Sequence, residues 1–440
     1  MSMGKRASKQ PDLFVAASEL RTPAHPFYEG LEKALTEGGF DAKVEKLCAP
    51  FYSETWGRRS IPPGVYFRMV MVGYFEEIAS ERGIVWRCRD SWSLRTFLGL
   101  LPTEEVPDHS SLSIIRRRLD TSVFEAVNKI VLELLAKAGL IKGEKVAIDS
   151  TLIAANAAMR SIARKDTRET YGEFAKRLAQ DAGEDVSTPE AVARADAKRK
   201  DKSVSNTDWE SKTDPDAKIA RMKDGSTHLA YKPEHAVDME TGAILATTVN
   251  PADEGDRQTM VGTIVEVERA LRAVGVEPKS PMIVADKGYH SDEMLAVLED
   301  AGYKPLIAEP HVPGHRRWTN KEAGSSERYH RNRRRLRSCR GKHWMRRRGE
   351  YVERSFAHQC DRGKLRRTYL RELDNVTKSY LMRVAGQNLG VLMRKKLGAG
   401  TPKALRDLLR ALLSLLRTVH AFVIARFVIR HDRLHGPASS

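Results

Sequence analysis

The sequence predicts an α/β protein in which helices flank a mixed β-sheet, an all-α domain precedes the sheet and a charged helical insertion interrupts it. Three observations lead to this class. Helical spacing marks residues 64–100 and 111–140, apolar runs alternate with helix-length segments after residue 144, and residues 157–226 are dense in charge and poor in large apolar side chains. A chain of 440 residues, 41% of them hydrophobic, is long enough for two or three domains with real cores.

The two helical segments of the N-terminal region are separated by the stretch "LPTEEVPDHSS". Pro107 breaks the chain there, and Asp108 or Ser110 is suited to cap the helix "SLSIIRRRL". A short turn followed by a basic helix suits a helix-turn-helix-like contact with DNA, and a solvated basic helix face explains the same residues equally well. The basic residues are Arg116, Arg117 and Arg118.

Further apolar runs predict the strands of the sheet. One strand begins at "EKVAIDSTLIAA", and the chain returns after the insertion with strands at 228–238 and 242–250. A helix near 256–273, the strand of "SPMIVADKGYHSDE", a helix near 291–301 and the short strand "KPLIAEP" follow. This order describes a mixed sheet with flanking helices, and it is the order of the ribonuclease H-like fold.

The charge of the chain is strongly basic and concentrated. Lys and Arg number 75 against 58 Asp and Glu, which gives a net charge of +17. Residues 311–371 hold 20 Lys or Arg against 5 Asp or Glu, so this segment carries an excess close to that of the whole chain. A concentrated basic segment favours an anionic partner, usually nucleic acid, although a basic protein without such a partner is the alternative.

Three negative features indicate a soluble, cytoplasmic protein with no membrane partner. The four cysteines are irregularly spaced, as in a reducing compartment, and the N-terminus has no apolar core of a signal peptide. The most apolar late segment, 408–429, is interrupted by arginines, so it is typical of an amphipathic helix and not of a membrane span.

Two aspartates directly follow apolar strands. Asp149 comes after Val146-Ala147-Ile148, and Asp286 comes after Met282-Ile283-Val284-Ala285. An ionised carboxylate next to a buried strand costs several kcal/mol unless its charge is compensated. A divalent cation compensates the charge and also supplies chemistry. Either residue taken alone is explained equally well as the start of a turn.

A third acid is available on a later helix, in "RRRGEYVERSFAHQC". Val352, Phe356 and Ala357 are spaced as the buried stripe of that helix, and Glu353 precedes the last two by three and four positions, so we expect it on the same inward face. A helix ion pair with the surrounding arginines is the alternative for Glu353. The conjunction of three acids on these elements, in this order, favours a metal site.

The sequence resembles the DDE transposases of bacterial insertion sequences over roughly residues 15–395. The matching stretches are "AIDSTLIAANA", "HLAYKPEHAVDMETGAI", "VADKGYHSDE" and "RRGEYVERSFAHQCDRGKLRRTYLR", and the N-terminal part is similar to the helical domain common in these enzymes. The resemblance implies a ribonuclease H-like catalytic core at 141–156 and 227–371, a helical DNA-binding domain at 1–140, an insertion at 157–226 and C-terminal helices at 372–440.

The resemblance also implies the chemistry. Asp149, Asp286 and Glu353 are then the catalytic triad and hold two Mg²⁺ ions, with Mn²⁺ as a substitute. The reaction is cleavage at the transposon ends followed by attack of the freed 3′-OH on target DNA. The implied partners are double-stranded DNA, both the inverted repeats and the target, and a second copy of the chain in a synaptic complex, in the nucleoid of a bacterial cytoplasm.

Several basic residues are candidate DNA contacts in this family context. Lys287 and His290 follow Asp286 directly, and for His290 a plain turn role is the stronger interpretation. Residue 360 is Cys where related enzymes carry a basic residue after the Glu, which leaves the roles of its neighbours open. The remaining candidates, for which ordinary surface charge is the alternative, are Arg346, Arg347, Arg348, Arg354, Arg362 and Lys364.

Two other functions compete with an active transposase. One is a catalytically inactive DNA-binding protein derived from a transposase, which the presence of all three acids disfavours. The other is a different ribonuclease H-like nuclease, which the N-terminal helical region disfavours. Trp209, an isolated aromatic residue in the charged insertion, is expected to anchor that insertion to the core and not to stack on a base.

Overall fold

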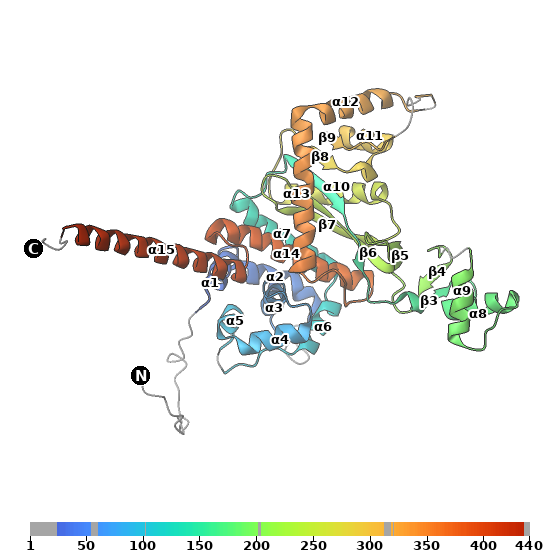
Figure 1. The fold of residues 1–440 in the computed structure, drawn as a ribbon, viewed down its shortest axis with the longest axis horizontal. Helices are drawn as coiled ribbons and strands as arrows, with labels where there is room; N and C mark the ends of the chain where they lie inside the picture. Colours follow the sequence, from blue (N-terminus) through green and yellow to red (C-terminus); the bar gives the residue numbers. More distant parts are fainter. Residues whose placement is uncertain are drawn as a thin grey trace, which may run out of the picture.

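The structure, a computed structural model, describes residues 24–53, 60–101, 103–200, 204–311, 318–319 and 321–434, so the first 23 residues of the predicted N-terminal domain lie outside it. Helices come first along the chain, and a mixed sheet follows (Figure 1). Asp108 caps α6 (His109–Arg118) as predicted, because its side chain accepts a hydrogen bond from the Ser110 backbone N–H. The N-terminal helices are α1 (Pro26–Glu37), α2 (Phe40–Cys48), η1 (Ala49–Phe51), α3 (Pro63–Phe75), α4 (Glu81–Asp90), α5 (Trp92–Phe97), α6 (His109–Arg118) and α7 (Thr121–Lys137).

The main sheet has the order β7 (Ile244–Pro251), β6 (Thr227–Asp238), β1 (Lys145–Ser150), β8 (Met282–Ala285) and β9 (Lys304–Ile307). β6 runs antiparallel to both of its neighbours, whereas β8 and β9 run parallel to β1. β2 and β5 pair with the first half of β6 and extend the sheet there. The strands are β1 (Lys145–Ser150), β2 (Ile153–Ala154), β5 (Lys218–Arg221), β6 (Thr227–Asp238), β7 (Ile244–Pro251), β8 (Met282–Ala285) and β9 (Lys304–Ile307).

Helices connect the parallel strands and cover the sheet. α10 (Asp256–Ala273) leads from β7 to β8, and α11 (Asp292–Asp300) leads from β8 to β9, close to the predicted limits. α12 (Ser325–Arg337) packs against β9, and α13 (Cys339–Asp361) lies across β1, β6 and β8. The long α13 therefore spans the part of the sheet that carries both predicted aspartates.

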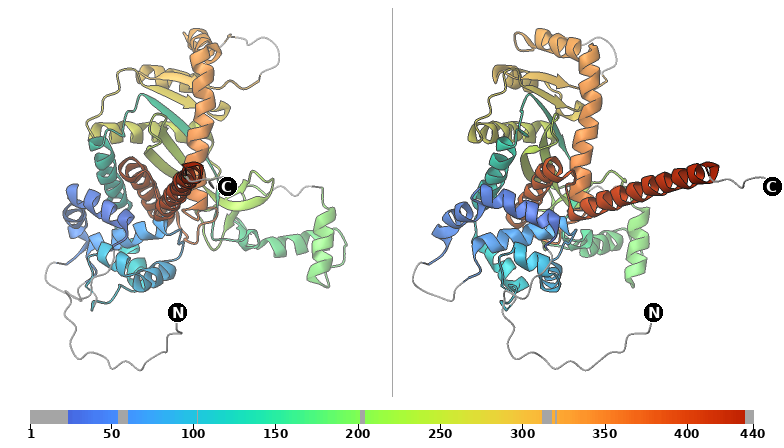
Figure 2. Two further views of the ribbon diagram at one scale, coloured as in Figure 1. Left: turned by 60° about the vertical axis from the view of Figure 1, so that its left-hand side comes forward. Right: turned by 90° about the vertical axis from the view of Figure 1, so that its left-hand side faces the viewer.

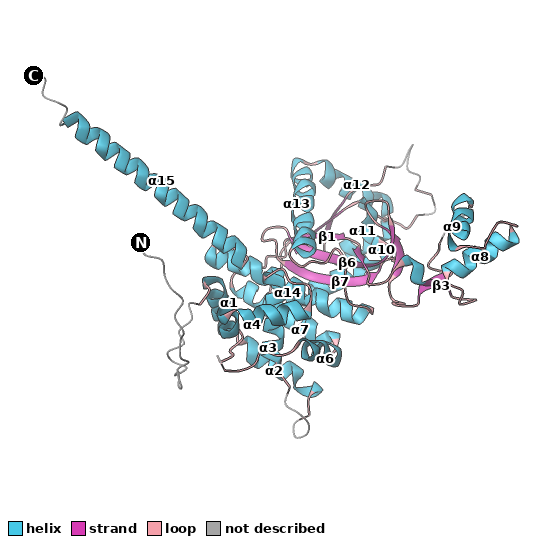
Figure 3. Ribbon diagram, turned by 60° about the horizontal axis from the view of Figure 1, so that its bottom comes forward, coloured by secondary structure: helices cyan, strands magenta, loops and turns pink. Residues whose placement is uncertain are grey.

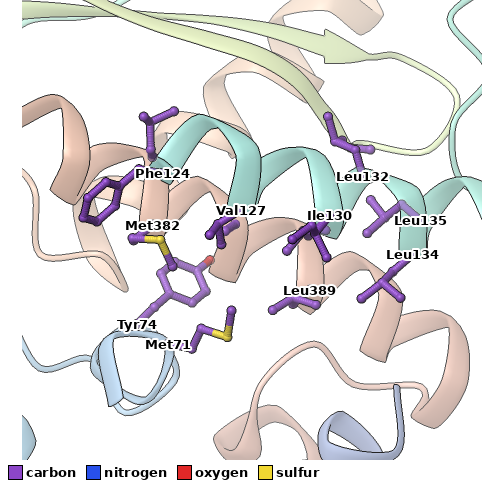
Figure 4. Packing of buried hydrophobic residues seen from close by; sticks show 14 of the residues in the cluster. Met71, Tyr74, Phe124, Val127, Ile130, Leu132, Leu134, Leu135, Met382 and Leu389 are labelled. Carbon is purple, nitrogen blue, oxygen red and sulfur yellow. The ribbon is translucent and has the colours of Figure 1, made fainter. Parts of the chain in front are cut away.

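α14 (Leu373–Leu397) occupies the centre of the molecule. It packs against α7, α3, α1 and β7, and its buried residues lie all around the helix. Figure 4 shows Met382 and Leu389 of α14 among Met71 and Tyr74 of α3 and a row of apolar side chains from α7. The same hydrophobic cluster includes Val146 and Ile148 of β1, so the N-terminal helices and one face of the sheet share one core.

The charged insertion stands away from the body of the protein (Figure 2). Trp209 is only 4% exposed and packs against Tyr171 and Phe174 within the insertion, in a cluster that continues to the second face of the sheet. This placement agrees with the anchoring role expected for Trp209. The elements of the insertion are η2 (Met159–Ser161), β3 (Ile162–Arg164), α8 (Tyr171–Asp181), α9 (Pro189–Lys198) and β4 (Trp209–Ser211), and β3 pairs with β4.

The last helix, α15 (Pro402–Leu434), leaves the body and projects into the surroundings (Figures 1 and 3). Only its first turn is buried, where Leu405 joins the core shared by α14 and the N-terminal helices. None of the described helices, α15 included, is both long enough and apolar enough to cross a membrane.

Candidate active site

The ends of two parallel strands bring Asp149 and Asp286 together. β1 and β8 pair Val146 with Ile283 and Ala147 with Val284, and continuing that register places Asp149 beside Asp286. Neighbouring strands lie about 4.8 Å apart, so the two carboxyl groups lie close together at the C-terminal ends of these strands. Asp286 also begins the 3₁₀ turn η3 (Lys287–Tyr289), where its Oδ1 accepts a hydrogen bond of 2.8 Å from the Gly288 N–H.

The carboxyl group of Asp149 is in an environment that opposes its ionisation. Burial raises its pKa, and the nearby charge of Asp286 raises it further. Arg348 of α13 counteracts both effects, since its Nη1 lies 2.7 Å from Asp149 Oδ2. Arg348 was expected only as a DNA contact, and the structure shows that it also supplies a positive charge to the acid pair.

Glu353 is not where its spacing predicted. Val352 and Phe356 are buried as expected, but Glu353 and Ala357 are exposed, so the prediction that Glu353 shares the inward face is wrong. Successive residues of a helix are rotated by about 100° around its axis. Glu353 is therefore turned away from the buried face that carries Val352 and lies on the flank of α13. Within the described part of the chain, no three His, Cys, Asp or Glu side chains are grouped closely enough to hold a metal ion.

A buried polar network that the sequence analysis missed lies beside the two aspartates. Lys232 Nζ forms an ion pair of 2.7 Å with Asp256 Oδ1, and the Ser150 hydroxyl donates to the same oxygen. Glu234 is fully buried and accepts hydrogen bonds from the hydroxyls of Tyr289, Thr259 and Thr263. Charged residues at alternate positions of the strand "HLAYKPEHAVD" were the signal for this network, because alternate residues share one face of a strand.

Gly288 is required here for space. A Cβ atom at this position would collide with Asp256 Oδ2 and would lie 3.1 Å from Asp286 Oδ1. Its backbone is not in the left-handed region. The glycine thus lets Asp256 approach the Asp286 turn, and it does not serve a turn that only glycine can adopt.

His235 fixes α13 to the sheet directly opposite Asp149. The two residues are register partners in β6 and β1. The Ser355 hydroxyl donates to the Val352 carbonyl, so it accepts from His235 Nδ1–H at 2.9 Å, and His235 Nε2 then accepts from the Tyr380 hydroxyl at 2.8 Å. Complete burial lowers the pKa of His235 to about 3, so the ring is a neutral link between β6, α13 and α14.

The basic residues predicted to contact DNA have different surroundings. Lys287 is exposed next to Asp286, whereas His290 is only 2% exposed and packs edge-on against Tyr329, so it is part of the interior. On α6, Arg116 pairs with Glu81 and is half-buried, whereas Arg117 and Arg118 are both exposed and Arg118 stacks over Tyr52. Arg346 is exposed on α13, and Arg347 contacts Glu350 and Tyr351 of its own helix.

Arg354 and Arg362 lie away from the acid pair. Together with Arg394 of α14 and His358 they line a pocket that also contains Thr241 and Gly242 of the β6–β7 turn, and among its described lining residues there is no Asp or Glu. The backbone N–H of Met239, next to this turn, donates to the carbonyl of Lys145 at the start of β1. Asp149 lies near the other end of β1, so the pocket and the acid pair are at opposite ends of this strand. Burial and the charges of Arg362 and Arg354 lower the pKa of Arg394, which marks a site suited to an anion.

Much of the basic charge of residues 311–371 is neutralised within the protein. Arg331 and Arg335 of α12 both pair with Glu299 of α11, and Arg333 pairs with Glu309. Lys364, another predicted DNA contact, lies 3.7 Å from Glu77. The concentration of charge in the sequence therefore overstates the basic surface that is open to a partner.

Two family models match parts of the chain. Residues 18–118 match a family described as Transposase domain (DUF772), and residues 192–389 match the Transposase DDE domain. Together the two matches cover about two thirds of the chain. The chain belongs to the DDE transposase family.

Within this DDE transposase, Asp286 and Glu353 fall inside the match to the DDE domain, and Asp149 precedes it. No curated protein matches the chain. Solved structures with some similarity include a piggyBac transposase synaptic complex with hairpin DNA, at 11% identity and a TM-score of 0.28 over 86% of this chain and 84% of that one. A Mos1 transposase paired-end complex with the left transposon end has 11% identity and a TM-score of 0.20 over 71% and 83% of the two chains. Similarity at this level carries no argument about the fold or the site.

Proposed function

We propose that this chain is an active transposase, which cleaves DNA at the ends of its element and joins the freed 3′-OH to target DNA. The observation that carries the proposal is the placement of Asp149 and Asp286 at the ends of adjacent parallel strands. The strand order β7-β6-β1-β8-β9, with an antiparallel first half and a parallel second half, supports a ribonuclease H-like core.

The two aspartates suit Mg²⁺. This ion is usually held by one or two carboxylates, with water and substrate phosphate oxygens as its other ligands, so a pair of carboxylates at the ends of adjacent strands is a suitable donor set. Asp149 and Asp286 would hold the metal, whereas Glu353, exposed on the flank of α13 and not grouped with the pair, would have to approach it to act as the third donor. When bound, two Mg²⁺ ions activate the attacking hydroxyl and stabilise the leaving oxygen of the DNA.

The residues around the pair have supporting roles in this proposal. Arg348 compensates the charge of Asp149 in the protein alone, and we propose that it binds a phosphate oxygen near the scissile bond when DNA and metal are present. His235 and the network around Glu234 hold α13 and the Asp286 turn in place. Two copies of the chain would pair two transposon ends.

Cleavage of DNA that carries the ends of the element tests the proposal. With Mg²⁺ or Mn²⁺ we expect nicking that leaves a 3′-OH at the element end, followed by joining to a target duplex. EDTA should abolish both steps and leave DNA binding in place, because binding depends mainly on phosphate contacts. Specific binding without any cleavage in either metal would instead identify an inactive DNA-binding derivative.

The pocket of Arg354, Arg362 and Arg394 is proposed as a second DNA phosphate site. Arg362→Gln and Arg394→Gln should each weaken binding for all sequences and reduce the slope of log affinity against log salt by about 1. Salt titrations of DNA binding measure this effect. Arg272→Gln, which removes an 82% exposed side chain on α10, is the matched control, and slopes equal to that control would contradict the site.

A further inference from the structure

Most of the exposed large apolar side chains of the described residues lie on α15. Residues 406–424 of the helix are all exposed, and Figures 1 to 3 show it projecting far from the body. Its leucines are open to solvent to an unusual degree, for example 48% for Leu412 and 64% for Leu416. An isolated helix with such a face is stabilised mainly by packing against a partner.

The apolar side chains follow the spacing of a coiled coil. Leu405, Leu409, Leu412, Leu416, Val419 and Val423 alternate at intervals of four and three residues. This is the a and d pattern of a heptad repeat, which forms a seam along one side of a helix. Leu405, at the base, is buried in the body of the protein, so the free seam begins at Leu409.

A second row widens this seam. Leu408, Leu415 and Phe422 repeat every seven residues beside it, and all three are exposed. Arg410 and Arg417 directly follow Leu409 and Leu416, which places them outside the centre of the seam. From Leu409 to Val423 the free seam is about 21 Å long at a rise of 1.5 Å per residue, which gives room for several layers of interlocking side chains.

We propose that α15 pairs with α15 of a second copy of this chain. A seam of leucine and valine with no charged residue at its central positions is complementary to itself, and a two-fold axis lets both copies bury the same surface. A lipid surface is the competing occupant, but membrane-surface helices are not restricted to intervals of four and three residues. The pairing concerns assembly, so it is independent of whether the chain cleaves DNA.

The mass of the full chain in solution, measured by sedimentation equilibrium without DNA, tests the pairing. We expect a dimer at roughly 10 μM, and the double variant Leu412→Glu, Leu416→Glu should dissociate at least about tenfold more readily. Both side chains are exposed in the single chain, so the variant should keep its fold and its melting temperature.

The double variant Ala411→Glu, Thr418→Glu is the matched control. It adds the same charge to exposed positions of α15 outside both apolar rows, and it should remain a dimer. A monomeric parent protein at this concentration overturns the proposal, as does a seam variant that dimerises as well as the control. Binding of a monomeric parent to vesicles of anionic lipid would assign the face to a membrane surface instead.

Discussion

Asp286→Asn and Asp149→Asn are each expected to reduce cleavage of transposon-end DNA by roughly 10²–10³-fold or more. A metal ion contributes several kcal/mol of stabilisation to the charge that develops in the transition state, and each 1.4 kcal/mol or so corresponds to a factor of ten in rate. An amide keeps the size of the side chain and removes the negative charge that retains the metal. Single-turnover cleavage in Mg²⁺, with DNA binding measured in parallel, determines the effect.

Asp300→Asn is the control for these two variants, because Asp300 is an exposed aspartate at the end of α11. It should cleave like the parent protein. If Asp286→Asn cleaves as well as Asp300→Asn, the acid pair is not the catalytic centre. If binding is lost together with cleavage, the carboxylates act in folding or DNA contact and not in metal chemistry.

Glu234→Ala is expected to lower the free energy of unfolding by about 3–5 kcal/mol, since removing one partner from a buried charged network leaves the others unpaired. The hydroxyls of Tyr289, Thr259 and Thr263 all donate to this carboxylate, and Lys232 is the nearby cation. Urea unfolding followed by circular dichroism measures the loss. Glu277→Ala, at an exposed position before β8, should change stability by less than about 0.5 kcal/mol.

The pH dependence of Glu234 gives an independent check. Burial raises the pKa of Glu234 above its ordinary value of 4.5, so the folded protein holds this proton more tightly than the unfolded chain does. The contribution of the protonated group to stability is therefore greatest below pH 4.5 and is lost as the pH rises toward the raised pKa. Glu234→Gln should lack this component, and an identical pH profile for parent and variant would contradict the raised pKa.

The acid pair was predictable from the sequence because it depends on local features. Apolar runs that end in aspartate identify Asp149 and Asp286 as strand-end residues, and parallel pairing then brings them together. The orientation of Glu353 was not predictable, because the rotation of α13 depends on links such as His235 to Ser355, which are 120 residues apart. The spacing of apolar residues predicts which face of a helix is buried. It does not predict which flank of the helix faces a site built from distant parts of the chain.

The basic surface shows the same limit for charge. A count of charges places an excess of positive charge in residues 311–371. The acids that pair with Arg331 and Arg333 are Glu299 and Glu309, and both precede that segment. Composition cannot reveal such pairs, since they depend on the packing of α12 against α11 and β9. The anion pocket was missed for a similar reason, because Arg394 comes from a different helix than Arg354 and Arg362.

The central position of α14 has a consequence for synthesis on the ribosome. This helix begins at Leu373 and packs against α1, α3 and α7, which are made first. At about 5–20 residues per second, the last of these helices, α7, waits roughly 10–50 seconds for the helix that closes their core. A chain that stops before this point lacks the helix against which all three of these helices pack, so their shared core is completed only late in translation.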